Sequence, residues 1–248
     1  MSLRKNFGRG GVAALVLAGA FVALPAMAAD HRDGAAAAAD PSSDINDVYA
    51  FMNGDNLVLG MTVSPFADAD ATFSDAVQFV WHVNTWSGFT DSIAGLPPAL
   101  ETTVQCEFDA AQMIQCWIHR DGENLDYILG DASAEEGIST ASSQVFAGLR
   151  SDPFYFYLTG FNAARTAVIN EVTAGNVDLS NGTLCPELTG GQLDALGDAL
   201  TASGPGAQGL NDFLGANTLA IVIEVDKALF IDADNDVVSV HAATHAKP

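Results

Sequence analysis

The chain has 248 residues, 49% of them hydrophobic, and its 31 Asp and Glu against 9 Lys and Arg give a net charge of −22 at pH 7. A surface this acidic repels nucleic acid and anionic lipid, so neither is expected as a partner. The length and the abundance of aliphatic residues exclude a disordered chain and provide material for a sizeable core.

The first 28 residues have the three parts of a secretory signal peptide. Arg4, Lys5 and Arg9 form a basic beginning, residues 12–24 are apolar, and Ala-Met-Ala at 26–28 marks a cleavage site. The apolar stretch is shorter than the roughly 20 residues that span a bilayer, and an uncleaved anchor is the alternative. No later segment is apolar enough to span a bilayer. We therefore expect a mature chain of residues 29–248 that is periplasmic or secreted.

Short apolar segments separated by turn residues dominate the first half of the mature chain and are typical of β-strands. Residues 53–56, Asn-Gly-Asp-Asn, favour one tight turn, and residues 109–111, Asp-Ala-Ala, favour another. The strands expected around and between these turns are 48–51, 57–63, 77–83, 102–108 and 113–119.

Two helices are expected in the second half of the chain. One covers residues 163–172, and the other covers 192–202, where Leu193, Leu196 and Leu200 recur at helical spacing. Gly-Pro-Gly at 204–206 ends the second helix. Residues 139–150 suit a strand or a short helix, and the pattern leaves both open.

The C-terminal part returns to strands. Residues 219–225 form the clearest buried strand, and 230–231 with 237–241 are expected to close the domain as a hairpin around the acidic turn 232–236. Strands do not alternate regularly with long helices, which disfavours a doubly wound α/β sheet. We predict a mainly β fold: a single antiparallel β-sandwich-like domain with a few short helices over residues 29–248.

Three cysteines bear on the redox compartment: Cys106, Cys116 and Cys185. In an oxidising compartment at least one pair is expected to be bridged. The predicted hairpin around 110–112 places Cys106 opposite Cys116, so a disulfide is expected there, and a bridge from one of them to Cys185 is the alternative. The spacing does not fit a CxxC motif, which disfavours zinc and thioredoxin-like chemistry.

Three segments together resemble a bacterial exported family. They are DHRDG at 30–34 with DPSSDINDVYAF at 40–51, FAGLRSDPFYF at 146–156, and NTLAIVIEV at 217–225. The series resembles the family catalogued as domain of unknown function 4331, and the resemblance runs through nearly the whole mature chain. It implies export and a shared fold, and it implies no particular activity.

Carboxylates and one imidazole gather near the start of the mature chain: His31, Asp33, Asp44 and Asp47. Oxygen ligands suit a hard cation such as calcium, and the imidazole also admits a borderline divalent ion. The alternative is a structural role, in which this segment lies on the sheet, Arg32 pairs with an acid and Asp44 caps a turn. We favour the structural role, and a divalent cation is the one candidate cofactor.

Arg150 and Asp152 place a guanidinium next to an acid. A functional arginine would grip a carboxylate or phosphate through two parallel hydrogen bonds. A structural arginine would pair with Asp152, or with Asp44 or Asp47, and so pin the N-terminal segment. We favour the structural role, because basic residues are few in this chain.

Asp232, Asp234 and Asp236 match the first three ligand positions of an EF-hand loop. Val237 and Ala243 stand where that loop needs glycine and a bidentate glutamate. A solvated turn is therefore expected, with weak calcium binding as the alternative.

The sequence contains no nucleophile elbow, no HExxH and no phosphate-binding loop. We predict an exported acidic protein that acts as a non-catalytic binding or structural module, with a cation as one candidate ligand. The alternative is an exported hydrolase whose site is assembled from dispersed residues such as His31, Asp47 and Arg150. Convergence of these residues in an open pocket would favour a ligand site, and mutual pairing would favour the structural role.

Overall fold

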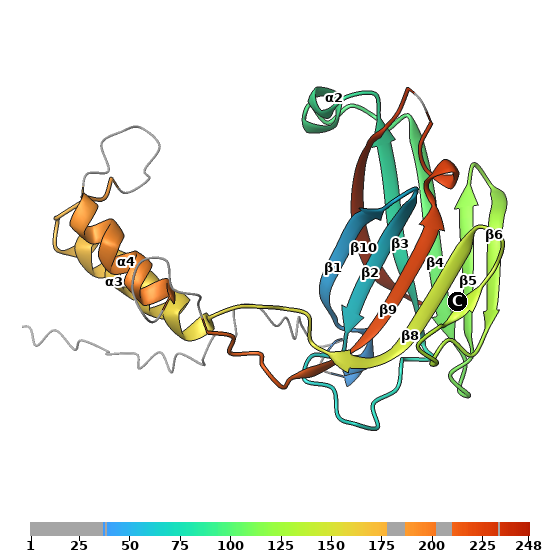
Figure 1. The fold of residues 1–248 in the computed structure, drawn as a ribbon, viewed down its shortest axis with the longest axis horizontal. Coiled ribbons are helices and arrows are strands. Elements are labelled where there is room, and N and C mark those ends of the chain that lie inside the picture. Colours follow the sequence, from blue (N-terminus) through green and yellow to red (C-terminus); the bar gives the residue numbers. More distant parts are fainter. Residues whose placement is uncertain (1–36, 38, 178–186, 202–209, 233) are drawn as a thin grey trace, which may run out of the picture.

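The computed structural model describes residues 37, 39–177, 187–201, 210–232 and 234–248. Within them, two five-stranded antiparallel sheets pack face to face (Figure 1). The predicted signal peptide, His31, Arg32, Asp33 and Cys185 lie outside the described residues. The mainly β, sandwich-like fold expected from the sequence is confirmed.

The strands of each sheet come from distant parts of the chain. The first sheet has the order β1-β2-β9-β8-β7, and the second has the order β10-β3-β4-β5-β6. The strands of the first sheet are β1 (Ile45–Asn53), β2 (Asn56–Val63), β7 (Ile138–Ser139), β8 (Ser143–Ser151) and β9 (Asn217–Asp226). Those of the second are β3 (Val77–Trp86), β4 (Leu100–Phe108), β5 (Ile114–Arg120), β6 (Glu123–Gly130) and β10 (Val237–Ala246).

The described helices are short and lie outside the two sheets. They are the 3-10 turns η1 (Pro41–Ser43) and η2 (Lys227–Leu229) and the α-helices α2 (Phe89–Ile93), α3 (Leu158–Thr173) and α4 (Gly190–Thr201). None of these described helices is long and apolar enough to cross a bilayer.

Side-chain alternation along the strands builds the core between the sheets. β2 and β9 turn four apolar side chains each toward the second sheet, and these are Leu57, Leu59, Met61, Val63, Leu219, Ile221, Ile223 and Val225. Trp81 of β3 meets them from the other sheet, is fully buried, and lies with its indole N–H 3.4 Å from the carbonyl of Gly60. Burial of each large apolar side chain contributes about 1.5–3 kcal/mol, so this layer holds the two sheets together.

A disulfide joins Cys106 of β4 to Cys116 of β5, as the hairpin register predicted. The two residues are direct cross-strand partners with Cα atoms 4.1 Å apart. The turn between the strands is held by Asp109, whose carboxylate accepts hydrogen bonds from the amides of Ala111 and Met113, both at 2.9 Å. A local turn therefore sets the register that brings the two sulfurs together.

The predicted closing hairpin is wrong. Asp232 and Asn235 form only an isolated bridge, and β10 pairs along its whole length with β3 in the second sheet. Phe230 is buried in the core, so the chain crosses from one sheet to the other at this point. Pairing with β10 covers the edge of β3, which a local hairpin would have left open, and β10 becomes the edge strand of the second sheet.

The structure settles one segment that the sequence left open and adds one strand that the sequence did not predict. Residues 143–151 form strand β8 and not a helix, because β8 pairs with the buried strand β9. Strand β6 was not expected, since its exposed side chains include Glu123, Asn124 and Tyr127 and break the apolar pattern. It forms because β5 offers it an open edge.

Helices α3 and α4 pack on each other as a hairpin that stands away from the sandwich on a two-segment stalk, residues 152–157 and 210–216 (Figure 1). The two segments are tied by backbone hydrogen bonds, from Asp152 to Ala216 and from Asp212 to Phe156, both at 3.0 Å. A continuous series of aromatic contacts runs along the stalk from the sandwich to the hairpin. Its members, in order, are Phe66, Phe213, Phe154, Phe156 and Phe161.

Candidate functional site

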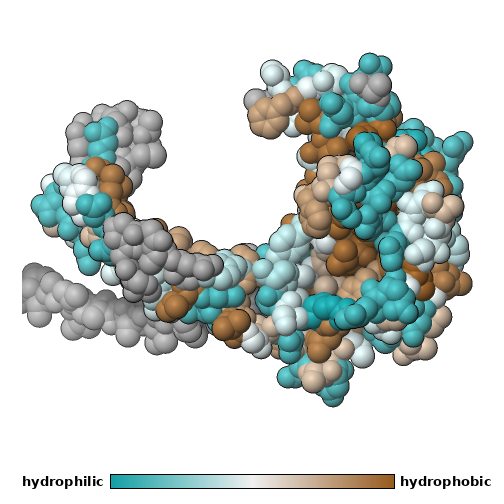
Figure 2. All heavy atoms as spheres, viewed as in Figure 1, coloured by the Kyte–Doolittle hydropathy of each residue, from teal (hydrophilic) through white to brown (hydrophobic). Residues whose placement is uncertain are grey.

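An apolar groove of about 400 Å³ lies on the outer face of the first sheet. Hydrophobic residues are visible on the sandwich surface in Figure 2. The floor of the groove is formed by Val58 and Gly60 of β2 and by Ala220 and Val222 of β9. The floor is deepest at Gly60, which has no side chain, and at Ala220, because their neighbours Val58 and Val222 are larger. The volume falls in the range of small-ligand sites, roughly 300–1,000 Å³.

The β1 wall of the groove consists of Tyr49 and Phe51. Both point outward because they pair with Gly60 and Val58, which lie on the outer face of β2. A Cβ atom at position 60 would lie 3.3 Å from the Cβ of Tyr49, so glycine leaves room for the tyrosine to lie across the strand. Phe51 is 57% exposed, which leaves it available for contact with a ligand.

The phenol of Tyr49 lies in a negative environment. Burial, then the charges of Asp47 and Asp152, and then a hydrogen bond to the side chain of Asp47 raise its pKa well above the usual range. The phenol therefore stays protonated, and this end of the groove has negative electrostatic potential.

The opposite wall contains Arg150 and Pro153. Arg150 is exposed, and its guanidinium carbon lies 3.9 Å from the centroid of the Phe146 ring, a cation–π contact. Its Nη1 donates a hydrogen bond of 3.0 Å to the carbonyl of Leu149. No salt bridge joins Arg150 to a carboxylate within the described part of the chain.

The expected pairing of Arg150 with Asp44, Asp47 or Asp152 is thus not found among the described residues. Arg150 lies on β8 and Asp47 on β1, and β2 and β9 lie between these two strands. Three strand spacings are about 14 Å, which is too far for a direct ion pair across the sheet. Asp152 instead accepts a hydrogen bond of 2.9 Å from the amide of Phe154, which forms a local turn.

The N-terminal carboxylates have separate local roles. Asp40, and not Asp44, caps η1 through its side chain, which accepts a hydrogen bond of 3.2 Å from the amide of Ser42. Asp44 is buried at the end of this turn, and Asp47 lies half-buried on β1. His31 and Asp33, the other two predicted metal ligands, lie outside the described residues.

No group of three or more His, Cys, Asp or Glu converges to hold a metal ion within the residues that the structure describes. At the acidic turn, Asp232 accepts hydrogen bonds from the amide of Asp234, at 2.9 Å, and from the side chain of Asn235, at 3.0 Å. These bonds are those of a self-contained turn.

A second polar feature lies on the outer face of the other sheet. His241 of β10 pairs with His82 of β3, and their rings stack with centroids 4.6 Å apart. Burial, then the neighbouring His241, lowers the pKa of His82; His245 acts in the same direction, and Glu101, 4.0 Å away, opposes it. Sequence reasoning missed this pair, because no local signal aligns β10 with β3.

Comparison of the whole chain with family models, with curated proteins and with solved structures finds no match in any of the three. Membership of the exported family that the sequence resembles therefore stays a prediction based on the three motifs.

Proposed function

We propose that this chain is an exported binding module whose ligand site is the groove on the outer face of the first sheet. The observation that carries the proposal is an open apolar groove with an aromatic wall, Tyr49 and Phe51, on a rigid sheet. The export signal at residues 1–28 and the resemblance to an exported family support its location. The disulfide agrees with that location, because disulfides persist in oxidising compartments.

The ligand class follows from the charges at the groove. The floor and walls are mostly apolar, so the body of the ligand is apolar. Asp47 and Asp152 act on the phenol at one end, and the chain as a whole has a net charge of −22. Arg150 keeps its positive charge and stacks on the ring of Phe146 at the opposite wall, away from Tyr49. We therefore assign the site to a small apolar molecule that carries a cationic group, which would lie toward Tyr49.

A matched pair of ligands tests this assignment. Decylamine and decanoate share nearly the same alkyl chain and differ in charge, and each can displace the neutral fluorescent probe N-phenyl-1-naphthylamine from the protein. We expect decylamine to compete at about tenfold lower concentration, which corresponds to about 1.4 kcal/mol. Failure of the probe to bind would overturn the groove as a site, and a preference for decanoate would overturn the charge assignment.

A matched pair of variants tests whether the ligand binds in the groove. Val222 lies on the groove floor with 37% of its surface exposed, so we expect the fold to tolerate Val222→Lys, which adds a positive charge to the site. We expect it to remove the preference for decylamine. The control is Leu129→Lys, the same charge introduced at an exposed apolar position of β6 on the other sheet. Equal effects of the two variants would point to the net charge of the protein and not to the groove.

A further inference from the structure

The α3–α4 hairpin buries very little of its own surface. On α3 only Gly160 and Ala164 are buried, and no residue of α4 is. The helices are held away from the sandwich by the stalk, so the sheets provide no cover for them (Figure 1). Helices of this length are marginal in water unless an apolar face is packed against another element.

Large apolar side chains remain uncovered on the hairpin. Phe161 and Ile169 on α3 are 38% and 50% exposed, and Leu193 and Leu200 on α4 are 56% and 44% exposed. Some hydrophobic surface, drawn in brown, is visible on this part of the molecule in Figure 2. Exposed apolar surface on a projecting element is suited to an interaction site.

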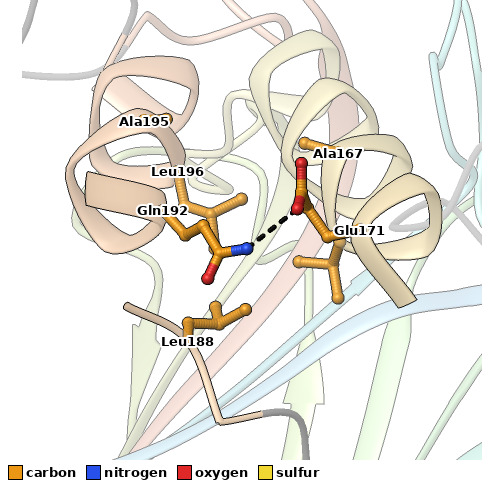
Figure 3. A pocket seen from close by; sticks show the side chains of 7 residues that line it. Ala167, Glu171, Leu188, Gln192, Ala195 and Leu196 are labelled. Carbon is orange, nitrogen blue, oxygen red and sulfur yellow. Dashed lines mark hydrogen bonds between the residues drawn. The ribbon is translucent and has the colours of Figure 1, made fainter. Parts of the chain in front are cut away.

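The interface within the hairpin is incompletely filled. A hollow of about 70 Å³ remains between the helices, lined mostly by apolar side chains such as Ala167, Ala195 and Leu196 and by the polar Gln192 (Figure 3). The side chains of Glu171 and Gln192 close it with a hydrogen bond of 2.9 Å. The two helices alone therefore do not form a well-packed core, and their arrangement resembles one half of a four-helix bundle.

Charge favours a second copy of the chain as the partner. α3 contains one basic residue, Arg165, and one acidic residue, Glu171, so it is neutral in a chain of net charge −22. Repulsion between two copies is therefore small along α3, whereas α4 has a net charge of −2 from Asp194 and Asp198. Arg165 is exposed, and α4 has two exposed acids, Asp194 and Asp198, which are suitable partners for it on a second hairpin.

We propose that two copies of the chain associate through their α3–α4 hairpins into a four-helix bundle. The bundle buries the exposed apolar side chains of both hairpins and leaves the groove of each sandwich open. The proposal is independent of the ligand assigned to the groove.

The test is the molar mass of the full exported protein in solution, measured by light scattering and sedimentation from about 1 to about 100 μM. We expect a dimer, and we expect Leu193→Asp to raise its dissociation constant at least about 30-fold. Leu129→Asp is the matched control, because Leu129 is also 56% exposed but lies on β6 of the sandwich, and it should leave the dimer intact.

A second readout separates loss of association from loss of folding. The three tryptophans, Trp81, Trp86 and Trp117, lie on β3 and β5, so their fluorescence follows the sandwich and not the hairpin. We expect Leu193→Asp to leave this fluorescence unchanged and to lower hydrogen-exchange protection in α3 and α4. A monomer at about 100 μM, or a dimer that Leu193→Asp does not weaken while the sandwich stays folded, would refute the proposal.

Discussion

Removal of the disulfide between Cys106 and Cys116 should lower stability by an amount that the structure allows us to estimate. The bridge closes a loop with a sequence separation of 10. In the chain-entropy model, a loop of this size restricts the unfolded chain by about 2.7 kcal/mol. Reduction of the disulfide keeps both sulfur atoms in place, so reduction alone should cost about this amount.

Replacement of both cysteines should cost more than reduction. Both side chains are buried in the core, with at most 1% of their surface exposed. Cys106→Ala with Cys116→Ala removes two buried sulfur atoms, and the cavity adds about 1 kcal/mol. The expected total is about 3.5–4 kcal/mol, which for a domain of this size lowers Tm by roughly 10 °C.

The assay is urea unfolding followed by tryptophan fluorescence, with the parent protein, the reduced protein and the double variant side by side. Trp117 lies next to Cys116 on β5, and Trp81 is fully buried, so both report on this region. One free thiol in the denatured, unreduced protein is expected, since the chain has three cysteines and two are bridged. A stability loss below about 1 kcal/mol would refute the reasoning, because it would mean that the unfolded chain is already restricted at this hairpin.

Three further perturbations have expected outcomes. The pKa of His82 in the folded protein lies below its unfolded value of about 6.5, so the unfolded chain binds more protons near that pH. The free energy of unfolding, measured by urea melts, should therefore fall as the pH drops through about 6.5. His82→Gln should make this pH dependence weaker. Asp212→Ala removes the acceptor of a 2.7 Å hydrogen bond from the Thr159 amide in the first turn of α3, so hydrogen exchange should show about 1 kcal/mol less protection in that helix and no change in the sandwich. Gly137→Ala should lower Tm by clearly more than Gly95→Ala. Both glycines have a positive φ, but only at position 137 does the added Cβ meet a backbone carbonyl, that of Val145. Equal losses at 137 and 95, an unchanged pH slope, or unaltered exchange in α3 would contradict these expectations.

Features encoded in neighbouring residues were predictable from the sequence alone. The turn at 53–56 joins β1 to β2, and the turn after Asp109 sets the register that pairs Cys106 with Cys116. The helical spacing of Leu193, Leu196 and Leu200 located α4. In each case a few consecutive residues determine the backbone geometry, so no distant contact is needed to specify the element.

Pairing between distant strands could be decided only by the tertiary structure. β2 pairs with β9 and β3 pairs with β10, and neither pairing leaves a local signal, because any strand with the right alternation fits the same edge. The groove consists of residues from β1, β2 and β9 with Arg150 at the end of β8, and the stacked histidines come from β3 and β10. Arg150 is a particular case, because the sequence placed it beside an acid but its guanidinium lies over the ring of Phe146, four residues earlier on the same strand. The order of the strands puts the carboxylates of β1 three strands away from it. The sequence determined most of the local elements of this protein, with β6 as an exception. The order of the strands determined which side chains meet, because side-chain contacts across a sheet depend on register and not on distance along the chain.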